Sequence, residues 1–244
     1  MKSYAVLFCV VMIGSVQCEE KKVATSNHKL EITPCKAADT ECLKASAEKL
    51  LPVLALGVPD YGIMSMDPMH VEQVKTTQAG LNMDFRNTTV TGLKHCKVLM
   101  LKRSGDRMSL DLKCSVNMQG DYTLGGRLLI MPIEGDGQYT IKIRDIIVNI
   151  QFQVAEKMVD EKVYWTVKSW KHTTEVQKGV HFQFDKLFNG NEQLSKAVHT
   201  FANENWRDIF QEVAPPIVKA IVAQILKEIT KLFVAVPIKD MVIE

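Results

Sequence analysis

The stretch from residue 192 to residue 233 constrains the fold of this chain most, because it predicts one very long amphipathic helix. In its first half, Leu194, Val198 and Phe201 recur at helical spacing. From residue 217 to residue 226, eight of ten residues are apolar, so this half is apolar nearly all round. Such a helix is buried or spans a membrane, and four charged residues within about 20 positions disfavour spanning. We therefore expect a core helix that the rest of the chain wraps.

Two prolines interrupt this helical pattern near its middle. Pro215 and Pro216 lack an N–H, and each ring clashes with the carbonyl four residues back. We expect either a kink near Ala214 or two abutting helices, the second opened by Pro215. Asn191 is expected to cap the start, and Pro237 to end the stretch. At about 1.5 Å per residue, some 40 residues span roughly 60 Å, so the protein should be elongated.

Between residues 81 and 184 the apolar residues alternate with a period of two, which predicts long strands. The candidate strands are Leu81–Phe85, Thr88–Leu101, Arg107–Tyr122, Arg127–Ile133, Tyr139–Val154, Val163–Trp170 and Val180–Phe184. Glycines at 125–126 and 135–137 indicate turns. The apolar phase shifts within Tyr139–Val154, and a bulge near Arg144-Asp145 would account for the shift and bend the strand.

The order of these elements predicts an α+β fold. A short helix from Asp39, stopped by Gly57, precedes the strands. Long, bent antiparallel strands followed by one long apolar helix suggest a strongly curved antiparallel β-sheet rolled around that C-terminal helix. The chain shows no internal repeat and no linker, so residues 19–244 are expected to form a single domain.

The first residues have the layout of a secretory signal peptide. A short positive start at residues 1–3 precedes an apolar, uncharged run at 4–14, and small residues precede Glu19-Glu20. We expect cleavage after Cys18; the alternative is a buried N-terminal strand. No second candidate span exists, so the mature protein is expected to be secreted, extracellular and without stable membrane insertion.

The charge of the chain is close to balanced. The formal net charge is +2, and removal of Lys2 with the signal peptide leaves about +1. The chain has no strong basic cluster that could bind the phosphates of nucleic acid, so we do not expect a nucleic-acid partner. The same balance disfavours a cationic protein that lyses membranes.

Four cysteines remain in the mature chain. Cys35 and Cys42 flank a short loop and are expected to form a local disulfide in an oxidising compartment. Cys96 and Cys114 lie symmetrically about Gly105, so a three-residue hairpin loop at 104–106 would place them opposite each other. They could then form a second disulfide or remain as two buried thiols, and both alternatives stay open.

No motif for catalysis is found. The chain has no GxSxG, HExxH, CxxC or phosphate-binding glycine loop, and its histidines lack close metal spacing. Ser195 and His199 lie on the polar face of a helix and are not expected to act as a dyad. We expect no enzyme, no cofactor and no metal. Asn87-Thr88-Thr89 is an acceptor sequence for N-glycosylation in a secreted chain.

The remaining signal is an excess of apolar surface, for which core packing is the ordinary explanation. A sheet rolled around one helix must also fill an elongated interior, and a chain of about 15 carbons buried there gains about 12 kcal/mol before the costs of binding. From strand face and helix spacing, the residues expected to line a ligand are Val98, Met100, Leu110, Leu112, Val116, Met118, Val148, Ile150, Phe152, Trp165, Phe182, Phe184, Phe201, Ile209, Val213 and Ile217.

A series of short motifs resembles the takeout family, which is related to arthropod haemolymph juvenile-hormone-binding proteins. In chain order they are Pro34-Cys35 with Cys42, Gly57-Val58-Pro59, Met66-Asp67-Pro68, Val90-Thr91-Gly92-Leu93, Gly120-Asp121-Tyr122, Leu187-Phe188-Asn189-Gly190 and Asn203-Glu204-Asn205-Trp206-Arg207. The resemblance implies a long helix wrapped by a curved sheet, a tunnel for a lipophilic ligand and a Cys35–Cys42 bridge. Cys96 and Cys114 are not part of that pattern. Dedicated juvenile-hormone carriers have a second disulfide farther along, so this chain is nearer the takeout branch.

We therefore expect a secreted carrier for a long hydrophobic small molecule such as a terpenoid, a fatty acid derivative or a quinone. It is expected to be a monomer, and a cell-surface receptor is a candidate partner. One alternative is a membrane-surface, lipid-transfer or lipopolysaccharide-binding protein of the wider superfamily, which the near-zero charge disfavours. Another is a signalling protein whose interior is filled by its own side chains.

Overall fold

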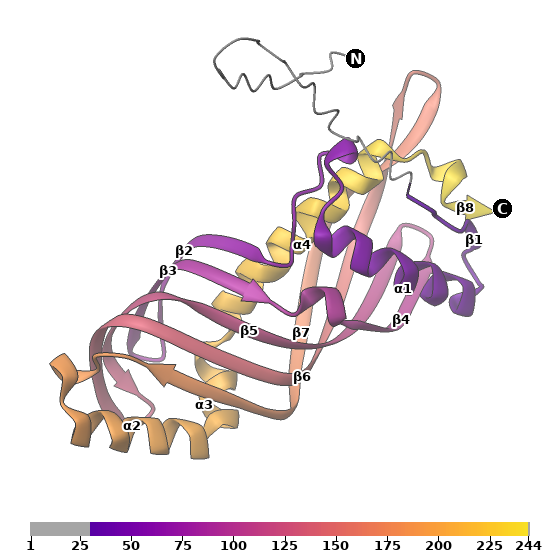
Figure 1. Cartoon of the computed structure of the whole chain (residues 1–244). Helices are drawn as coiled ribbons and strands as arrows, with labels where there is room; N and C mark the ends of the chain where they lie inside the picture. The colour runs from indigo at the N-terminus through magenta and orange to yellow at the C-terminus, as the bar shows by residue number, and fades with distance from the viewer. Residues whose placement is uncertain (1–29, 244) are drawn as a thin grey trace, which may run out of the picture.

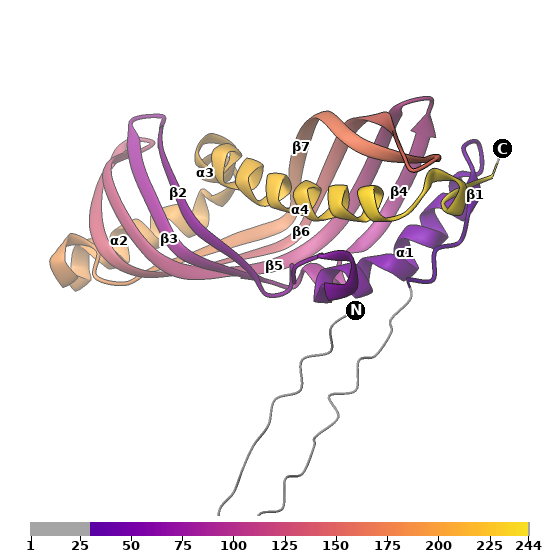
Figure 2. The ribbon, with the colours of Figure 1, turned by 90° about the horizontal axis from the view of Figure 1, so that it is seen from above.

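The core helix expected from the C-terminal stretch is α4 (Pro215–Ala235) in the computed structural model, which describes residues 30–243. The signal peptide predicted at residues 1–18 lies outside the described residues. Pro215 opens α4, as in the second of the two alternatives, and Asn191 caps α2 (Glu192–Glu204) by accepting from the Leu194 amide. α4 lies along the concave face of a curled sheet (Figures 1 and 2).

The single rod of roughly 60 Å is wrong, because the chain breaks at Asn205 as well as at Ala214. A third helix, α3 (Trp206–Val213), lies between the two breaks. The Asn205 side chain donates to the Phe201 carbonyl at 2.8 Å and so ends α2. The 21 residues of α4 alone form the central rod, about 30 Å long. α2 turns away from α4 at the end of the molecule opposite the first helix, α1 (Thr40–Leu56; Figure 1).

Six antiparallel strands form the curled sheet, in the order β2-β3-β5-β6-β7, with β4 beside β3 on the same edge of β5. Their bounds are β2 (Met69–Gln78), β3 (Leu81–Thr91), β4 (Lys97–Ser104), β5 (Arg107–Leu128), β6 (Met131–Val159) and β7 (Lys162–Phe184). Their concave face carries the apolar residues and packs on α4, which confirms the predicted α+β fold with a curved antiparallel sheet.

Several predicted strand ends are wrong. β2 was not predicted, β3 continues through residues 86–87 and stops at Gly92, and β5, β6 and β7 run unbroken through segments expected to be turns or gaps. The glycines at 125–126 and 135–137 lie inside strands. A Cβ on Gly135 would come 2.7 Å from the Tyr122 hydroxyl oxygen. Gly126 and Gly137 likewise lie close to neighbouring backbone, whereas Gly125 does not, and the β5–β6 turn falls instead at residues 129–130.

A line of irregularities across three strands makes the sheet curl. The ladders shift register at Ser115 in β5, at Asp145 in β6 and near Gly179 in β7. The Ser115 hydroxyl accepts from the Asp145 amide at 3.0 Å. Hydrogen bonds from the ammonium groups of Lys178 and Lys113 to the Asp145 carboxylate lower its pKa to about 2. The bulge predicted near Arg144-Asp145 is confirmed, and aligned bulges bend all three strands together.

The predicted Cys35–Cys42 disulfide is present, with a Cα–Cα distance of 5.7 Å, and of the two alternatives left open for Cys96 and Cys114 the structure has the disulfide, at 4.3 Å. The predicted three-residue hairpin loop is wrong, because Ser104 pairs with Arg107 across a two-residue turn. A bulge at Leu99 then restores the offset, since Val98 pairs with Leu112. The cysteines consequently meet despite the different turn.

The helix predicted after Asp39 is α1 (Thr40–Leu56), capped by the Asp39 carboxylate and ended by Gly57. α1 packs beside β4, and the parallel pair β1 (Cys35–Lys36) and β8 (Val242–Ile243) lies at its N-terminal end. Four 3₁₀ turns complete the described chain: η1 (Pro59–Tyr61), η2 (Leu93–His95), η3 (Phe188–Gly190) and η4 (Ile238–Asp240). Within residues 30–243, no helix has the length and apolar character needed to cross a bilayer.

Candidate functional site: two apolar cavities along the core helix

An inner cavity of about 120 Å³ lies between the concave face of the sheet and the helices α3 and α4. Apolar side chains from four strands and three helices line it, and His199 of α2 is the single polar side chain on its wall. The α4 residues that face it are Ile217, Val218, Ile221, Val222 and Ile225. A ligand in this space would meet hydrocarbon almost everywhere.

An outer cavity of about 210 Å³ lies farther along α4, between α1 and the β4–β5 hairpin. Its α4 wall is made of Ile225, Ile229, Leu232 and Phe233. Three polar residues, Thr33, Ser46 and Arg103, also line it. The outer cavity is therefore apolar with a few polar groups, which is the usual composition of a small-molecule site.

The two cavities meet at Leu93, Leu112 and Ile225, which line both of them. Leu93 belongs to η2, Leu112 to β5 and Ile225 to the middle of α4. Three aliphatic side chains thus form the partition, and no polar group of the described chain adds to it. Aliphatic rotamers exchange without breaking hydrogen bonds, so this partition is the natural point for a long apolar molecule to pass.

An aromatic cluster lies beside the inner cavity. Phe85 and Phe184 line the cavity. Behind them, Tyr139 packs edge-on against Phe85 with 4.8 Å between ring centroids, and Tyr122 packs edge-on against Phe184 with 4.9 Å. The Tyr122 hydroxyl donates to the Asp185 carbonyl at 2.5 Å, and the Tyr139 hydroxyl lies 2.7 Å from that of Thr88. Burial raises the pKa of each tyrosine to about 12, with the Asp185 charge adding to the effect at Tyr122. Both phenols are therefore neutral and hydrogen-bonded behind the cavity wall.

The structure places fourteen of the sixteen sequence-predicted lining residues on these cavity walls; their contact with a ligand stays a prediction. Leu112, Val116, Met118, Val148, Ile150, Phe182, Phe184, Ile209, Val213 and Ile217 line the inner cavity, and Val98, Leu110, Phe152 and Trp165 join Leu112 on the outer one. Helix α1, the strand β3 and the second half of α4 also contribute walls. Their helical and two-residue periods were visible in the sequence, but nothing local showed which of them would face a void.

Met100 and Phe201 lie outside both cavities. The bulge at Leu99 inverts the alternation in β4, so Leu101 and Arg103 face the outer cavity instead of Met100. The break at Asn205 separates α2 from the helices that follow, and α2 presents Val198, His199 and Ala202 to the inner cavity.

Ser195 and His199 do approach each other, with 3.3 Å between Oγ and Nδ1. The Phe184 amide of the edge strand β7 donates to His199 Nε2 at 2.9 Å, so the neutral ring carries its proton on Nδ1 and donates it to Ser195. Burial holds the pKa of His199 below its ordinary value. The imidazole therefore has no lone pair to activate the hydroxyl, and the pair docks α2 on the sheet edge. Asn203 adds bonds to the Phe182 amide and carbonyl.

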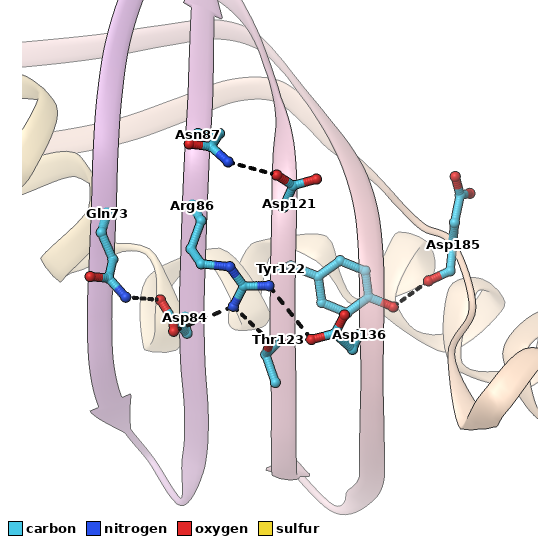
Figure 3. A network of polar contacts seen from close by, with 9 residues as sticks. All are labelled: Gln73, Asp84, Arg86, Asn87, Asp121, Tyr122, Thr123, Asp136 and Asp185. Carbon is cyan, nitrogen blue, oxygen red and sulfur yellow. Dashed lines mark hydrogen bonds and ion pairs between the residues drawn. The ribbon is translucent and has the colours of Figure 1, made fainter.

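The convex face carries polar side chains where the concave face carries apolar ones. Figure 3 shows Arg86 of β3 donating to Thr123 at 2.8 Å and lying 3.5 Å from the Asp136 carboxylate. Asn87 is exposed and its amide donates to Asp121 at 2.9 Å. Its glycosylation stays a prediction, which a glycosidase-sensitive mass shift lost in Asn87→Gln would test. Among residues 30–243, no group of three or more His, Cys, Asp or Glu is placed to hold a metal.

The class that this geometry defines is an α+β protein whose curled antiparallel sheet and core helix enclose apolar cavities. The sequence model of the haemolymph juvenile hormone binding protein family matches residues 6–243, so the chain belongs to that family. The structure superposes on Takeout 1 of Epiphyas postvittana with a TM-score of 0.84 and 28% sequence identity, over 86% of this chain and 99% of that one.

Two sequence relatives agree with this assignment. The circadian clock-controlled protein daywake of Drosophila melanogaster is 24% identical over 201 residues, which cover 76% of this chain and 77% of daywake. A juvenile hormone-binding protein of Manduca sexta is 30% identical over 88 residues, or 35% of this chain and 38% of that protein. The resemblance to the takeout family is thereby confirmed.

Proposed function

We propose that this protein is a secreted carrier that binds one long lipophilic small molecule, such as a terpenoid, a fatty acid derivative or a quinone, in the two cavities along α4. The observation that carries the proposal is the inner cavity wall, where His199 is the single polar side chain and is already hydrogen-bonded. Burial of hydrocarbon is the chief interaction such a wall offers, worth about 0.8 kcal/mol per methylene.

The setting of the cavities supports the same proposal. Family membership and the name of the Manduca sexta relative are consistent with a lipophilic ligand. Two disulfides suit an oxidising, extracellular compartment. The absence of an activated nucleophile at Ser195–His199 supports a role in binding without catalysis.

Native mass spectrometry of the glycan-trimmed, secreted protein tests the proposal. A carrier should show one bound lipid in the gas phase, or, after organic extraction, take up the neutral fluorophore N-phenyl-1-naphthylamine at one saturable site. Monomers that retain no lipid and bind no fluorophore would instead favour a signalling protein with a filled interior. Binding that appears only with liposomes would favour the membrane-surface alternative.

A further inference from the structure

Arg103 is the one charged residue on the wall of either cavity within the described part of the chain. It reaches the outer cavity because the bulge at Leu99 turns the odd-numbered residues of β4 inward. Charged side chains on apolar walls are uncommon unless they are paired, since removing a charge from water is costly. The partners of Arg103 therefore decide whether its place is structural or serves a ligand.

The protein contacts of Arg103 leave part of its guanidinium without an acceptor. Its Cζ lies 4.7 Å from the ring centroid of Trp165, a buried side chain that itself packs edge-on against Phe233 at 5.7 Å. Its Nε donates to the Gly105 carbonyl at 3.3 Å. Among residues 30–243, neither an ion pair nor a hydrogen bond of the two Nη groups is found. One face and one edge of the guanidinium are thus fixed, while the paired Nη donors stay available.

The rest of the cavity system offers no competing charge. The inner cavity has only His199, whose two nitrogens are both hydrogen-bonded. In the outer cavity, the Ser46 hydroxyl donates to the Thr33 carbonyl. An anionic head group would therefore find its best partner at Arg103, with the tail directed toward the inner cavity.

We propose that Arg103 binds the carboxylate of the ligand, so that this protein selects a long-chain carboxylic acid over its ester or alcohol. The inference rests on the proposed carrier function and adds the class of ligand. A guanidinium held over the Trp165 ring presents two parallel N–H groups, which match the two oxygens of a carboxylate. Arg103 pairs with Met108 of β5, and Leu112 of the same strand lies at the partition. Between these two residues β5 advances about 13 Å, which is enough to hold the first part of the tail in the outer cavity.

Competition against N-phenyl-1-naphthylamine, a neutral probe, tests the selection. Palmitic acid, methyl palmitate and hexadecanol have nearly equal tails and differ in the head. The full mature protein should bind the acid about tenfold to hundredfold more tightly than the ester, the usual range for hydrogen bonds to a charged group. Arg103→Gln should lose this preference while keeping the ester affinity, and Arg103→Lys should keep part of it. Lys102→Gln removes the same charge from the exposed outer face and should behave as the wild type.

Further outcomes separate the two proposals. Equal affinity for acid and ester in the wild type would overturn the role of Arg103 and leave the carrier function standing. Binding of none of the three ligands, with no uptake of the probe, would overturn the carrier function itself. An equal loss of acid and ester affinity in Arg103→Gln would show that Arg103 only supports Trp165.

A measurement on the wild type alone guards against a variant that fails to fold. The ¹³C resonance of carboxyl-labelled palmitate reports ionisation of the bound head group. Contact with Arg103 should hold the pKa of the bound acid below its value in a neutral apolar site, and acidification through that pKa should abolish the preference over the ester. A bound carboxyl that titrates well above its ordinary pKa would contradict the contact.

Discussion

Replacement of Ile225 by tryptophan should divide the two cavities and limit the length of tail that the protein can bind. Ile225 lies at the partition with Leu93 and Leu112, and it faces both cavities from the middle of α4. An indole at this position fills the passage without touching the outer wall at Arg103. Short ligands should therefore bind as before, and long ligands should lose the part of their tail that reaches the inner cavity.

The size of the effect follows from two lengths. β5 advances about 13 Å between Met108 and the partition at Leu112. An extended chain covers about 3.3–3.6 Å per three bonds, so about eleven carbons fill the outer cavity. A sixteen-carbon tail then places about five methylenes in the inner cavity. At about 0.8 kcal/mol each, their exclusion costs about 4 kcal/mol, or about a thousandfold in Kd.

Displacement of N-phenyl-1-naphthylamine by saturated alcohols of eight to sixteen carbons measures this effect without involving a charged head. In the wild type, Kd should fall about fourfold per methylene over the whole series. In Ile225→Trp the fall should stop near eleven carbons. Val234→Trp places the same indole on an exposed position of α4 and is the matched control. Parallel curves for Ile225→Trp and the control would refute the passage between the cavities.

Three other perturbations test the fold that holds the cavities. Joint replacement of Cys96 and Cys114 by serine should lower the free energy of unfolding by about 3 kcal/mol, since the bond closes an 18-residue loop; urea titration measures it. The depressed pKa of Asp145 means that its stabilisation is complete above the unfolded pKa near 3.8 and disappears as pH falls through about 2. The melting temperature of the wild type should fall as pH is lowered from about 5 to about 2, and this fall should be smaller in Asp145→Asn. An equal fall in both proteins would contradict the ion pairs. The pKa of His199 is also lowered, so the pH dependence has the same sign: its contribution is complete above the ordinary value near 6.5 and weakens as pH falls below it. Hydrogen exchange at the Phe184 amide, corrected for its intrinsic rate, should speed up at about pH 5 relative to about pH 7.5, and equal protection would refute the bond to His199.

The local signals in the sequence were sufficient for the kinds of element and for the architecture. The alternation of apolar residues placed a long sheet between residues 81 and 184, and caps at Asp39 and Asn191 set the starts of two helices. The phase shift near Arg144-Asp145 located a bulge, because one extra residue reverses every side chain after it. These features depend on neighbours within a few positions, so they are legible in the chain itself.

Glycines illustrate the limit of such reasoning. A pair of glycines at 125–126 has the composition of a turn, yet both residues lie within β5. Gly135 is needed because the hydroxyl of Tyr122 approaches from the neighbouring strand. A tight turn and a close approach between strands both favour glycine because it has no side chain, and only the packed structure shows which of the two applies.

Residue identities alone therefore determined a curled sheet around an apolar helix, the Cys35–Cys42 bridge and an apolar interior. Only the tertiary structure decided that the helix breaks at Asn205, that Arg103 replaces Met100 on the cavity wall and that the interior divides at Ile225. The physical reason is the range of the interactions. Periodicity and capping act over one or two turns, whereas strand register, bulge position and void shape are set by residues distant in the chain that meet only after folding.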